Sequence, residues 1–483
     1  MTISDKKLEE LLQKHFGFSE FRSGQKDVIH SLLERKSTLA ILPTGTGKSL
    51  CYQLIGKICK KPVVIISPLI SLMQDQVEQL RFAGEKRVVA LTSVLPFERK
   101  KYVIEHLEHF NFIYLAPEML NKKEVVEKLM GLDLALLVVD EAHCISKWGP
   151  DFRPDYLGLG DLRKKLNSPT TLALTATATK KVEEDIIRIL FDRQKIKTIR
   201  HSVDRPNIFL AVENVENQKE KNQKLVQLVE RLKTPGLIYF SSKKKADEIA
   251  DLLRQKSKLN VSSYHAGRTA IDRYTVQQQF MRGELDVICA TSAFGMGVNK
   301  KNIRYVIHYH LPADLESYLQ EIGRAGRDGK QSIAILLYQA SDVILQRQLI
   351  NMTLPEDEMI QYYMDNMQRL KGHAGEQGEL LDYYCKQGLS SRQVKELFSR
   401  RRDEKSKNLN EILAYINTAE CRREYIKRYF GEEGSQIHSG LCCQLMGEKL
   451  DLAKLGMEET EEVTAESSIS SNYQKTIRKL FNL

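Results

Sequence analysis

Residues 42–49 read LPTGTGKS, directly after the apolar run Ser37–Leu42. A short apolar run is typical of a buried strand, and Gly45 and Gly47 allow the following chain to turn with its N–H groups pointing inward. Such a turn can surround the oxygens of a phosphate group. Leu42 stands where the general G-x-x-x-x-G-K-[ST] pattern has its first glycine, so the match is partial. The stretch still predicts a phosphate-binding loop between a strand and a helix, which is typical of an α/β fold.

Two side chains complete the chemistry of this loop. Lys48 supplies a positive charge for the β- and γ-phosphates, and the Ser49 hydroxyl is a ligand for Mg²⁺. An ordinary glycine-rich turn is the alternative, but the adjacent lysine and serine between a strand and a helix argue against it. The residues predicted to contact the nucleotide are Thr44, Gly45, Thr46, Gly47, Lys48 and Ser49.

Acidic residues follow a second apolar run. Leu134–Val139 precedes the sequence Asp140-Glu141-Ala142-His143, and open α/β sheets bind ligands at the carboxyl ends of their strands. We expect Asp140 to hold Mg²⁺ and Glu141 to orient or deprotonate the water that attacks the γ-phosphate. His143 could couple the nucleotide state to a neighbouring element. The alternative is a helix start that favours acids, but the phosphate loop upstream favours the metal site.

Short apolar runs alternate with polar, helix-patterned segments as far as Tyr338. This alternation is typical of parallel α/β sheets. A break at Lys195–Asn222 separates the runs into two groups and predicts two sheets of five or six strands each. The expected strands are Ser37–Leu42, Val63–Ser67, Val88–Leu91, Phe112–Ala116, Leu134–Val139 and Thr171–Leu174, then Gly236–Phe240, Val261–Tyr264, Asp286–Ala290, Ile303–His308 and Ile333–Tyr338.

The second group of strands is accompanied by a pair of arginines. Glu321–Gly329 reads EIGRAGRDG, so Arg324 and Arg327 are three residues apart, and one helical turn or tight loop could aim both the same way. An arginine inserted across an interdomain cleft stabilises charge on a phosphoryl group during its transfer. The alternative is a surface charge pair. Upstream, residues 290–299 read ATSAFGMGVN, whose glycines permit close approach of the backbone to a ligand.

Composition limits the classes of function. The chain has 483 residues, and its 73 Lys and Arg exceed its 63 Asp and Glu, for a formal net charge of +10. This balance favours acidic partners such as nucleic acids or nucleotides. No apolar run approaches the ~18 residues of a membrane span, and the first residues do not resemble a signal peptide. The eight cysteines show no regular spacing of a secreted disulfide scaffold, so we expect a soluble cytoplasmic protein.

Taken together, the motifs resemble those of superfamily 2 helicases, specifically the RecQ family. The resemblance covers residues 10–340 and resumes weakly at 407–446. It implies an α/β fold of two tandem RecA-like parallel-sheet domains, followed by a helical, basic region similar to a zinc module and by an acidic, serine-rich tail. The expected divisions are residues 1–205, 206–340, 341–450 and 451–483.

The resemblance also implies roles for individual residues. Phe16–Gln25 (FGFSEFRSGQ) is similar to the family's adenine-reading motif, in which Phe18 would pack on the base while Arg22 and Gln25 would bond to it. Thr175–Thr179 (TATAT) resembles a coupling motif. The catalytic residues implied are Lys48, Asp140, Glu141, Arg324 and Arg327, and the coupling residues are His143 and Gln320.

The most specific resemblance lies in His143–Tyr156 (HCISKWGPDFRPDY), which is similar to the aromatic-rich loop that couples single-strand binding to ATP hydrolysis in RecQ helicases. It holds Trp148, the only tryptophan of the chain, with Phe152 and Arg153 close by. A flat aromatic ring can stack on a base, worth ~1–3 kcal/mol. The alternative is a core position for Trp148, but the loop is too polar for a core segment. We therefore expect these three side chains to bind DNA.

The C-terminal region departs from the family pattern. Lys407–Glu432 resembles the central helix of the family's zinc module, after which a C-x₂-C-x₂-C run is expected. Residues 438–446 instead read HSGLCCQLM, so four clean zinc ligands are missing. Adjacent cysteines rarely chelate one ion, which leaves bound zinc uncertain. The candidate substitute ligands are Cys421, His438, Cys442 and Cys443.

Only 37 residues follow Met446, too few for the winged-helix domain that splits base pairs in the family. We therefore expect no such domain, as in the short RecS-type bacterial paralogues. One substitute is visible: Gly388–Arg402, with Leu380–Lys386 before it, resembles a small helix-turn-helix. It would hold duplex phosphates through Arg400-Arg401-Arg402. The alternative is a solvated basic helix that packs on its neighbour.

The expected function is that of an ATP-dependent DNA helicase that translocates 3′→5′ on single-stranded DNA and unwinds duplex, in repair or recombination. ATP and Mg²⁺ are its expected cofactors. Two alternatives stay open: an ATP-gated DNA-binding or annealing clamp with little unwinding, and an RNA helicase, against which the aromatic-rich loop argues. We expect single-stranded and tailed duplex DNA as partners, a single-strand DNA-binding protein as a candidate partner, no membrane, a monomer, and a cytoplasmic location at the bacterial nucleoid.

Overall fold

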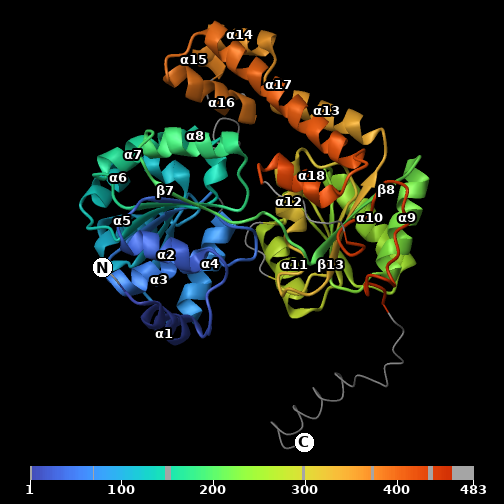
Figure 1. The fold of residues 1–483 in the computed structure, drawn as a ribbon. Coiled ribbons are helices and arrows are strands. Elements are labelled where there is room, and N and C mark those ends of the chain that lie inside the picture. Colours follow the sequence, from blue (N-terminus) through green and yellow to red (C-terminus); the bar gives the residue numbers. More distant parts are fainter. Residues whose placement is uncertain are drawn as a thin grey trace, which may run out of the picture.

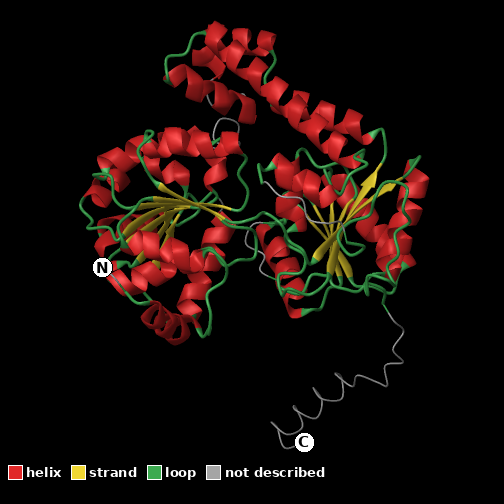
Figure 2. Cartoon of the chain, in the orientation of Figure 1, coloured by secondary structure: helices red, strands yellow, loops and turns green. Residues whose placement is uncertain are grey.

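The computed structural model describes residues 3–68, 70–146, 154–295, 300–370, 375–432 and 439–459. Figures 1 and 2 show two sheet-centred domains beside each other, with a small group of helices beyond the first. A search of the helices in these ranges finds none that combines the length and the apolar character of a bilayer span.

The first domain is built on a sheet of parallel strands in the order β3-β4-β2-β5-β6-β1-β7. The central strands, such as VVII and LLVV, are buried at every position because helices cover both faces. The strands are β1 (Thr38–Ile41), β2 (Val63–Ile66), β3 (Val88–Leu91), β4 (Phe112–Leu115), β5 (Leu136–Val139), β6 (Thr171–Thr175) and β7 (Lys197–Arg200).

The helices of the first domain alternate with these strands. They are α1 (Asp5–Phe16), α2 (Gln25–Leu33), α3 (Ser49–Cys59), α4 (Ile70–Phe82), α5 (Phe97–Glu105), α6 (Lys123–Met130), α7 (Leu159–Lys165) and α8 (Lys180–Phe191), with the 3₁₀ turns η1 (Leu107–His109), η2 (Pro117–Asn121), η3 (Ala142–Ile145) and η4 (Pro154–Gly158).

The second domain repeats this plan with a parallel sheet in the order β10-β11-β9-β12-β13-β8. Its strands are β8 (Ile208–Asn214), β9 (Gly236–Tyr239), β10 (Val261–Tyr264), β11 (Val287–Ala290), β12 (Tyr305–His308) and β13 (Ser332–Tyr338), and its helices are α9 (Gln218–Arg231), α10 (Lys243–Lys256), α11 (Ala270–Arg282) and α12 (Leu315–Ile322). The predicted fold class, two parallel-sheet domains followed by helices, is confirmed.

The predicted break at residues 195–222 does divide the chain into two sheets, but it contains two strands that were not predicted. β7 closes the first sheet by pairing with β1, and β8 forms the edge of the second by pairing with β13. The sequence of β7, KTIR, buries only Ile199 fully, so this edge strand has no apolar run to reveal it. The first sheet therefore has seven strands rather than the predicted five or six.

Helices fill the region beyond Ser341. They are α13 (Asp342–Thr353), α14 (Asp357–Asp365), α15 (Met367–Leu370), α16 (Gly375–Lys386), α17 (Ser391–Ile416) and α18 (Arg422–Tyr429). The helix predicted at Gly388–Arg402 is confirmed as the start of α17, and the Ser390 side chain caps it by accepting a hydrogen bond from the backbone N–H of Gln393.

Helix α17 has 26 residues and joins two hydrophobic cores. Val394 and Phe398 near its start are buried in a small core with α14 and α16, which we call the helical bundle (residues 354–402). Ile412 and Tyr415 near its end are buried in the core of the second domain. Figure 1 shows the bundle over the α8 side of the first domain while α17 descends to the second.

The chain after α18 returns to the second domain. Cys443 forms a parallel bridge with Leu210 of β8, and Glu458 forms an antiparallel one with Leu232 after α9. Leu452 and Met457 are buried in the core under α9 and α10. The segment predicted as a tail, residues 451–483, thus begins with residues that pack on the second domain.

Candidate active site

The phosphate loop lies at the carboxyl end of β1 and leads into α3. Gly45 has a φ of 85° and Gly47 a φ of 73°, and residues other than glycine rarely adopt these backbone conformations. Lys48 occupies the position before the helix, and Ser49 is its first residue. The loop thus has the backbone shape that the sequence predicted, in spite of Leu42 at its start.

Side chains from the Phe16–Gln25 segment donate hydrogen bonds to backbone carbonyls of this loop. Gln25 Nε2 donates to the carbonyl oxygens of Thr46 (2.7 Å) and Gly47 (3.0 Å), and Arg22 donates to the carbonyl of Gly45. Gln25 is buried, whereas the side chain of Phe18 is 48% exposed. Phe18 is therefore free to pack on a flat ligand beside the loop, while Gln25 and Arg22 are bonded to the phosphate loop itself.

Two carboxylates, those of Asp140 and Glu141, lie adjacent and largely out of solvent at the carboxyl end of β5. Burial first, and the charge of Glu141 second, raise the pKa of Asp140 to about 7, while Lys48 acts in the opposite direction. Glu141 adopts the left-handed conformation (φ 49°), and its Oε2 atom is buried without a hydrogen bond. Two adjacent carboxylates beside a lysine can bind a divalent cation. The Oε2 atom of Glu141 is then available to accept a proton from a water molecule.

His143 connects the acidic segment to the end of β6. Its Nδ1 atom lies 3.0 Å from the Thr175 hydroxyl and 3.4 Å from Glu141 Oε2. Thr175 in turn donates to the Thr177 carbonyl at 2.9 Å. His143 thus touches both the acidic pair and the Thr175–Thr179 segment, which is the contact that a coupling residue requires.

Of the two predicted arginines, Arg327 lies at the interface between the domains, and Arg324 lies near it within the second domain. A methyl group placed on Gly45 would come within 3.2 Å of Arg327 Cγ, so the Arg327 chain lies directly against the phosphate loop. Burial first, then Arg324 and Arg205, lower the pKa of Arg327 to about 9. Arg324 is buried and donates to the carbonyl of Gly295. Of the two, Arg327 is the one that faces the phosphate loop.

The loop that carries these arginines also touches the phosphate loop through its backbone. The Thr44 hydroxyl donates to the Gly323 carbonyl at 3.1 Å. Gln320 lies half-buried on α12 beside Glu321, whose carboxylate is 2.8 Å from His308 Nε2. The two halves of the site therefore meet directly, although about 280 residues of chain separate Thr44 and Gly323.

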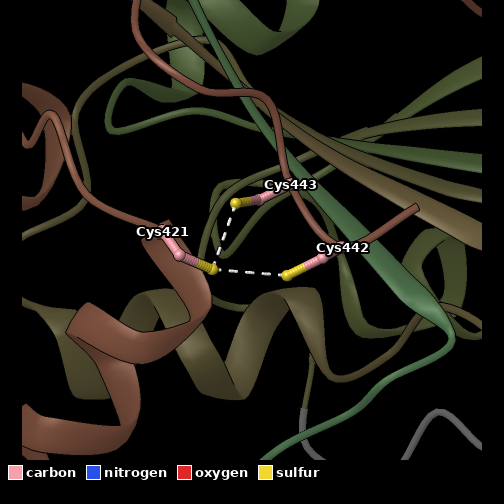
Figure 3. A group of neighbouring side chains, drawn as sticks. All are labelled: Cys421, Cys442 and Cys443. Carbon is pink, nitrogen blue, oxygen red and sulfur yellow. Dashed lines mark hydrogen bonds between the residues drawn. The ribbon is translucent and has the colours of Figure 1, made fainter. Parts of the chain in front are cut away.

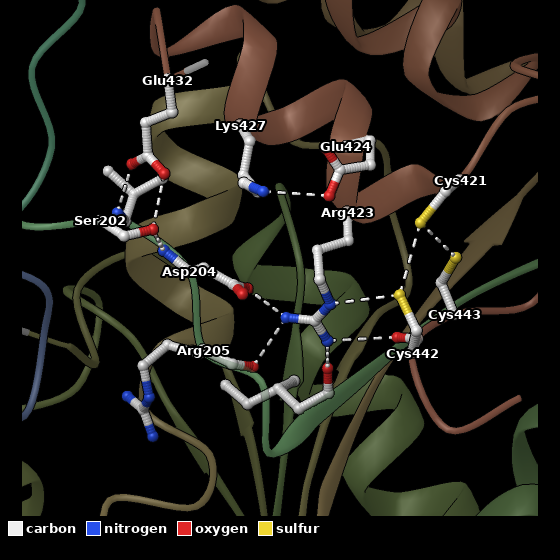
Figure 4. Close-up of polar contacts among 12 residues, drawn as sticks. Ser202, Asp204, Arg205, Cys421, Arg423, Glu424, Lys427, Glu432, Cys442 and Cys443 are labelled. Carbon is white, nitrogen blue, oxygen red and sulfur yellow. Dashed lines mark hydrogen bonds and ion pairs between the residues drawn. The ribbon is translucent and has the colours of Figure 1, made fainter. Parts of the chain in front are cut away.

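Sequence reasoning missed two arginines at this junction, Arg205 and Arg423. Figure 4 shows Arg423 of α18 reaching the segment that joins the domains, where it pairs with Asp204. Arg205 donates to carbonyls of both loops of the site. Both arginines bond mainly to backbone oxygens, so no pattern of side chains could indicate their partners.

The residues predicted to bind DNA fall into two groups. Trp148, Phe152 and Arg153 lie outside the described residues. The basic run at 400–402 lies on α17, where Arg400 is exposed. Arg401 lies over the rings of Tyr384 (5.3 Å) and Phe398 (5.0 Å) inside the helical bundle.

Arg402 is also used within the helical bundle. It donates to the Pro355 carbonyl and pairs with Asp357, both at 3.0 Å. Two of the three arginines of the run, Arg401 and Arg402, therefore contact other residues of the bundle. Arg400 is exposed and accessible to a phosphate group.

Three of the four candidate zinc ligands come together. Figure 3 shows Cys421, just before α18, with its sulfur facing those of Cys442 and Cys443, at Sγ–Sγ distances of 3.4 and 3.5 Å. A tetrahedral Zn²⁺ with bonds of ~2.3 Å would place its sulfur ligands about 3.8 Å apart, so the three sulfurs fit one ion. The fourth candidate, His438, lies outside the described residues.

Cys442 is the most acidic of the three thiols. A hydrogen bond with Cys443 first, and the Arg423 guanidinium next, lower the pKa of Cys442 to about 5. Arg423 Nε lies 3.3 Å from the Cys442 sulfur. A thiolate at this position is the form that binds a metal.

Comparison with known proteins agrees with this geometry. A sequence profile of the DEAD/DEAH box helicases matches residues 22–185, one of the helicase conserved C-terminal domain matches residues 220–329, and one of the RecQ zinc-binding domain matches residues 340–445. The chain is 42% identical to a protein of Bacillus subtilis (strain 168) described as probable ATP-dependent DNA helicase RecS, over 99% of this chain and 98% of that protein. The chain belongs to the RecQ family of ATP-dependent DNA helicases.

This chain covers about two thirds of a second relative. ATP-dependent DNA helicase RecQ of Bacillus subtilis (strain 168) is 35% identical over 432 residues, which are 88% of this chain and 64% of that protein. Among solved structures, helicase Lhr of Mycobacterium smegmatis aligns with a TM-score of 0.58 at 22% identity over 71% of this chain and 50% of that one, and helicase MrfA with 0.60 at 17% over 72% and 53%. These two show the shared fold.

The family implies ATP and Mg²⁺, and the residues present fit both. The inward turn at Gly45 and Gly47 leaves the loop N–H groups and Lys48 for phosphate oxygens. Asp140 and Glu141 are adjacent acids, and burial first and Glu141 second raise the pKa of Asp140, so a divalent cation would neutralise this pair. Asp140 and Ser49 are the side chains that would hold that ion.

The buried acidic pair leads to a stability prediction. At pH 8, above the pKa of Asp140, Asp140 is ionised beside Glu141, so Glu141→Gln removes a repulsion from the nucleotide-free fold. The midpoint of thermal unfolding without Mg²⁺ should stay the same or rise, by about 2–4 °C for each kcal/mol relieved.

The matched control for this prediction is Glu183→Gln. Glu183 pairs with Arg200 at 2.5 Å, so its neutralisation removes an attraction and should lower the midpoint. A fall in Glu141→Gln as large as that in Glu183→Gln would contradict the interpretation of the acidic pair.

Proposed function

We propose that this RecQ-family protein is a DNA helicase that translocates 3′→5′ on single-stranded DNA and unwinds duplex in DNA repair or recombination. The observation that supports the motor is the meeting of two distant loops: Arg327 of the second domain lies against Gly45 of the phosphate loop. A site divided between two domains can open and close with each ATP, which converts hydrolysis into relative movement of the domains.

The residue roles in ATP hydrolysis follow from their places. Lys48 and the loop N–H groups bind the phosphates, and Asp140 with Ser49 would hold Mg²⁺, which would neutralise negative charge on the phosphates. Glu141, with its buried Oε2 atom, accepts a proton from the attacking water. Arg327 stabilises charge on the γ-phosphate from the opposite domain.

Unwinding of labelled duplexes tests the motor. Substrates with a 3′ tail, a 5′ tail or no tail are incubated with ATP and Mg²⁺, with Lys48→Ala as the control. We expect strand separation for the 3′-tailed duplex alone and none with Lys48→Ala, because the lysine charge is required at the phosphates. Unwinding from the 5′ tail would overturn the direction, and activity in Lys48→Ala would overturn the assignment of the site.

Two other outcomes would select the alternatives. ATP hydrolysis stimulated by single-stranded DNA without strand separation would indicate an ATP-gated clamp or annealing factor. Stronger stimulation by single-stranded RNA than by DNA would indicate an RNA helicase.

We also propose that the helical bundle contacts duplex DNA, since α16 and α17 follow each other across a short turn, as the two helices of a helix-turn-helix do. The bundle lies beside the first domain: Lys181 of α8 pairs with Glu404 of α17 at 2.6 Å. Burial, then Tyr384 and the Asp155 carboxylate, raise the pKa of Tyr383 on α16. Asp155 belongs to the predicted aromatic-rich loop, His143–Tyr156, so duplex held by the bundle would lie near that loop.

Salt dependence of binding tests this contact. Arg400→Ala should weaken duplex binding to a similar extent for all sequences and reduce the slope of log affinity against log salt by about 1, because it removes one exposed phosphate contact. Arg402→Ala is the control. Because the Arg402 guanidinium already pairs with Asp357 inside the bundle, its removal should leave the slope unchanged. Identical slopes for wild type and Arg400→Ala would refute the proposal.

We propose further that Cys421, Cys442 and Cys443 bind a structural zinc ion, with His438 as the fourth ligand. The three sulfurs lie within 4.8 Å of one another. Metal analysis of protein purified without chelator should give about one equivalent of zinc, which Cys421→Ser lowers. Fewer than ~0.2 equivalents in the wild type would exclude the site.

A further inference from the structure

Arg205, in the segment between the two sheets, bonds to both halves of the candidate active site. Its Nη1 atom donates to one carbonyl of the phosphate loop and one of the arginine-bearing loop, each at 3.1 Å. Its Nη2 atom donates to two further carbonyls of the second loop, at 3.0 and 2.7 Å. One planar group thus joins both loops. The four acceptors are Thr44, Gly323, Ala325 and Gly326.

The fit around this guanidinium is close. A side chain on Gly323 would collide with the Thr44 hydroxyl, so the two loops meet at van der Waals contact. The cavity that remains, lined by Thr44, Arg205 and Gly323, measures about 20 Å³, room for roughly one water molecule. Asn207 adds a second link from the same segment, by donating to the carbonyls of Gly326 and Lys330 at 2.9 Å.

The backbone of Arg205 is itself fixed from the opposite side. Arg423 of α18 donates to the Arg205 carbonyl at 3.0 Å and to the Ile208 carbonyl at 2.7 Å, and it pairs with Asp204 (Figure 4). The position of the Arg205 side chain is therefore determined by the protein on both sides.

The charge environment argues against a purely structural role. Arg205 is half-buried near other cations. Burial first, and the charge of Arg22 second, lower its pKa, while the smaller effects of Asp204 and Asp328 raise it, and Arg205 in turn lowers the pKa of Arg327. Placing an arginine beside other arginines is unfavourable for folding. A neutral side chain could donate to some of the same carbonyls without that repulsion. The positive charge of the Arg205 guanidinium is therefore better explained by a site that binds an anion.

We infer that Arg205 is a positioning residue for ATP hydrolysis, which holds the loop of Arg327 against the phosphate loop so that Arg327 faces the γ-phosphate. This inference rests on the proposed ATPase. Because Arg327 acts on charge that develops during phosphoryl transfer, loss of its placement lowers kcat more than it weakens nucleotide binding.

Kinetics of Arg205→Gln and Arg205→Lys test the inference. We expect kcat of the DNA-stimulated ATPase to fall by about 10- to 100-fold in both, the effect of misplacing a catalytic group by ~1 Å. The Kd of a fluorescent ATP analogue should change by less than about threefold. Lysine keeps the charge but cannot span four carbonyls with one ammonium group, so it should not restore kcat.

A double-substitution cycle shows whether Arg205 acts through Arg327. If it does, Arg205→Gln combined with Arg327→Ala should have the same kcat as Arg327→Ala alone. Independent losses that multiply in the double variant would overturn the inference.

Arg254→Gln is the matched control for stability. Arg254 of α10 also donates to a backbone carbonyl, that of Val261 at 3.0 Å, and pairs with Asp251. Val261 begins β10, so this contact lies at the amino end of the strands, away from both loops of the site. Arg254→Gln should lower the thermal midpoint and leave kcat unchanged. Arg205→Gln with that same profile would overturn the inference, and if it does not fold, Arg205→Lys decides by the same criterion. Wild-type protein without DNA-stimulated turnover would instead refute the proposed function.

Discussion

The side-by-side burial of Asp140 and Glu141 is the constraint on which the rest of the site depends. Two like charges in the interior repel each other, so the fold must bring cations to them from elsewhere. Lys48 comes from the phosphate loop, and Arg327 comes from the other domain. The domains therefore have an electrostatic reason to meet at this edge of the sheets, where a nucleotide with its metal ion would complete the balance of charge.

Much of the fold could be predicted because buried parallel strands are continuous apolar runs. β5, with the sequence LLVV, is one example. The two missed strands have different causes. β7 is a polar edge strand, and β8, although apolar, directly follows the Arg205-Pro206-Asn207 turn and was assigned to the connecting segment. Helix α17 was predicted in two parts, yet no glycine or proline interrupts Ser391–Ile416 to divide it.

The candidate site was predictable to the extent that its chemistry requires particular side chains at fixed spacing. The glycines around Thr46, and the acids after β5, are required by phosphate and metal in any such site. Arg205 and Arg423 carry no such signal, because their acceptors are backbone carbonyls that every residue possesses. Only the folded arrangement of the two sheets and α18 shows what these arginines join.

The length of α17 has a mechanical consequence. A helix of 26 residues is about 39 Å long, and its last turns are buried in the core of the second domain while its first turns carry the helical bundle. A rotation of the second domain by ~10° would therefore displace the far end of this lever by about 7 Å, which is two base-pair steps of duplex DNA. A small closure of the domains around the nucleotide would therefore move the helical bundle, beside the first domain, by about the length of one or two nucleotides.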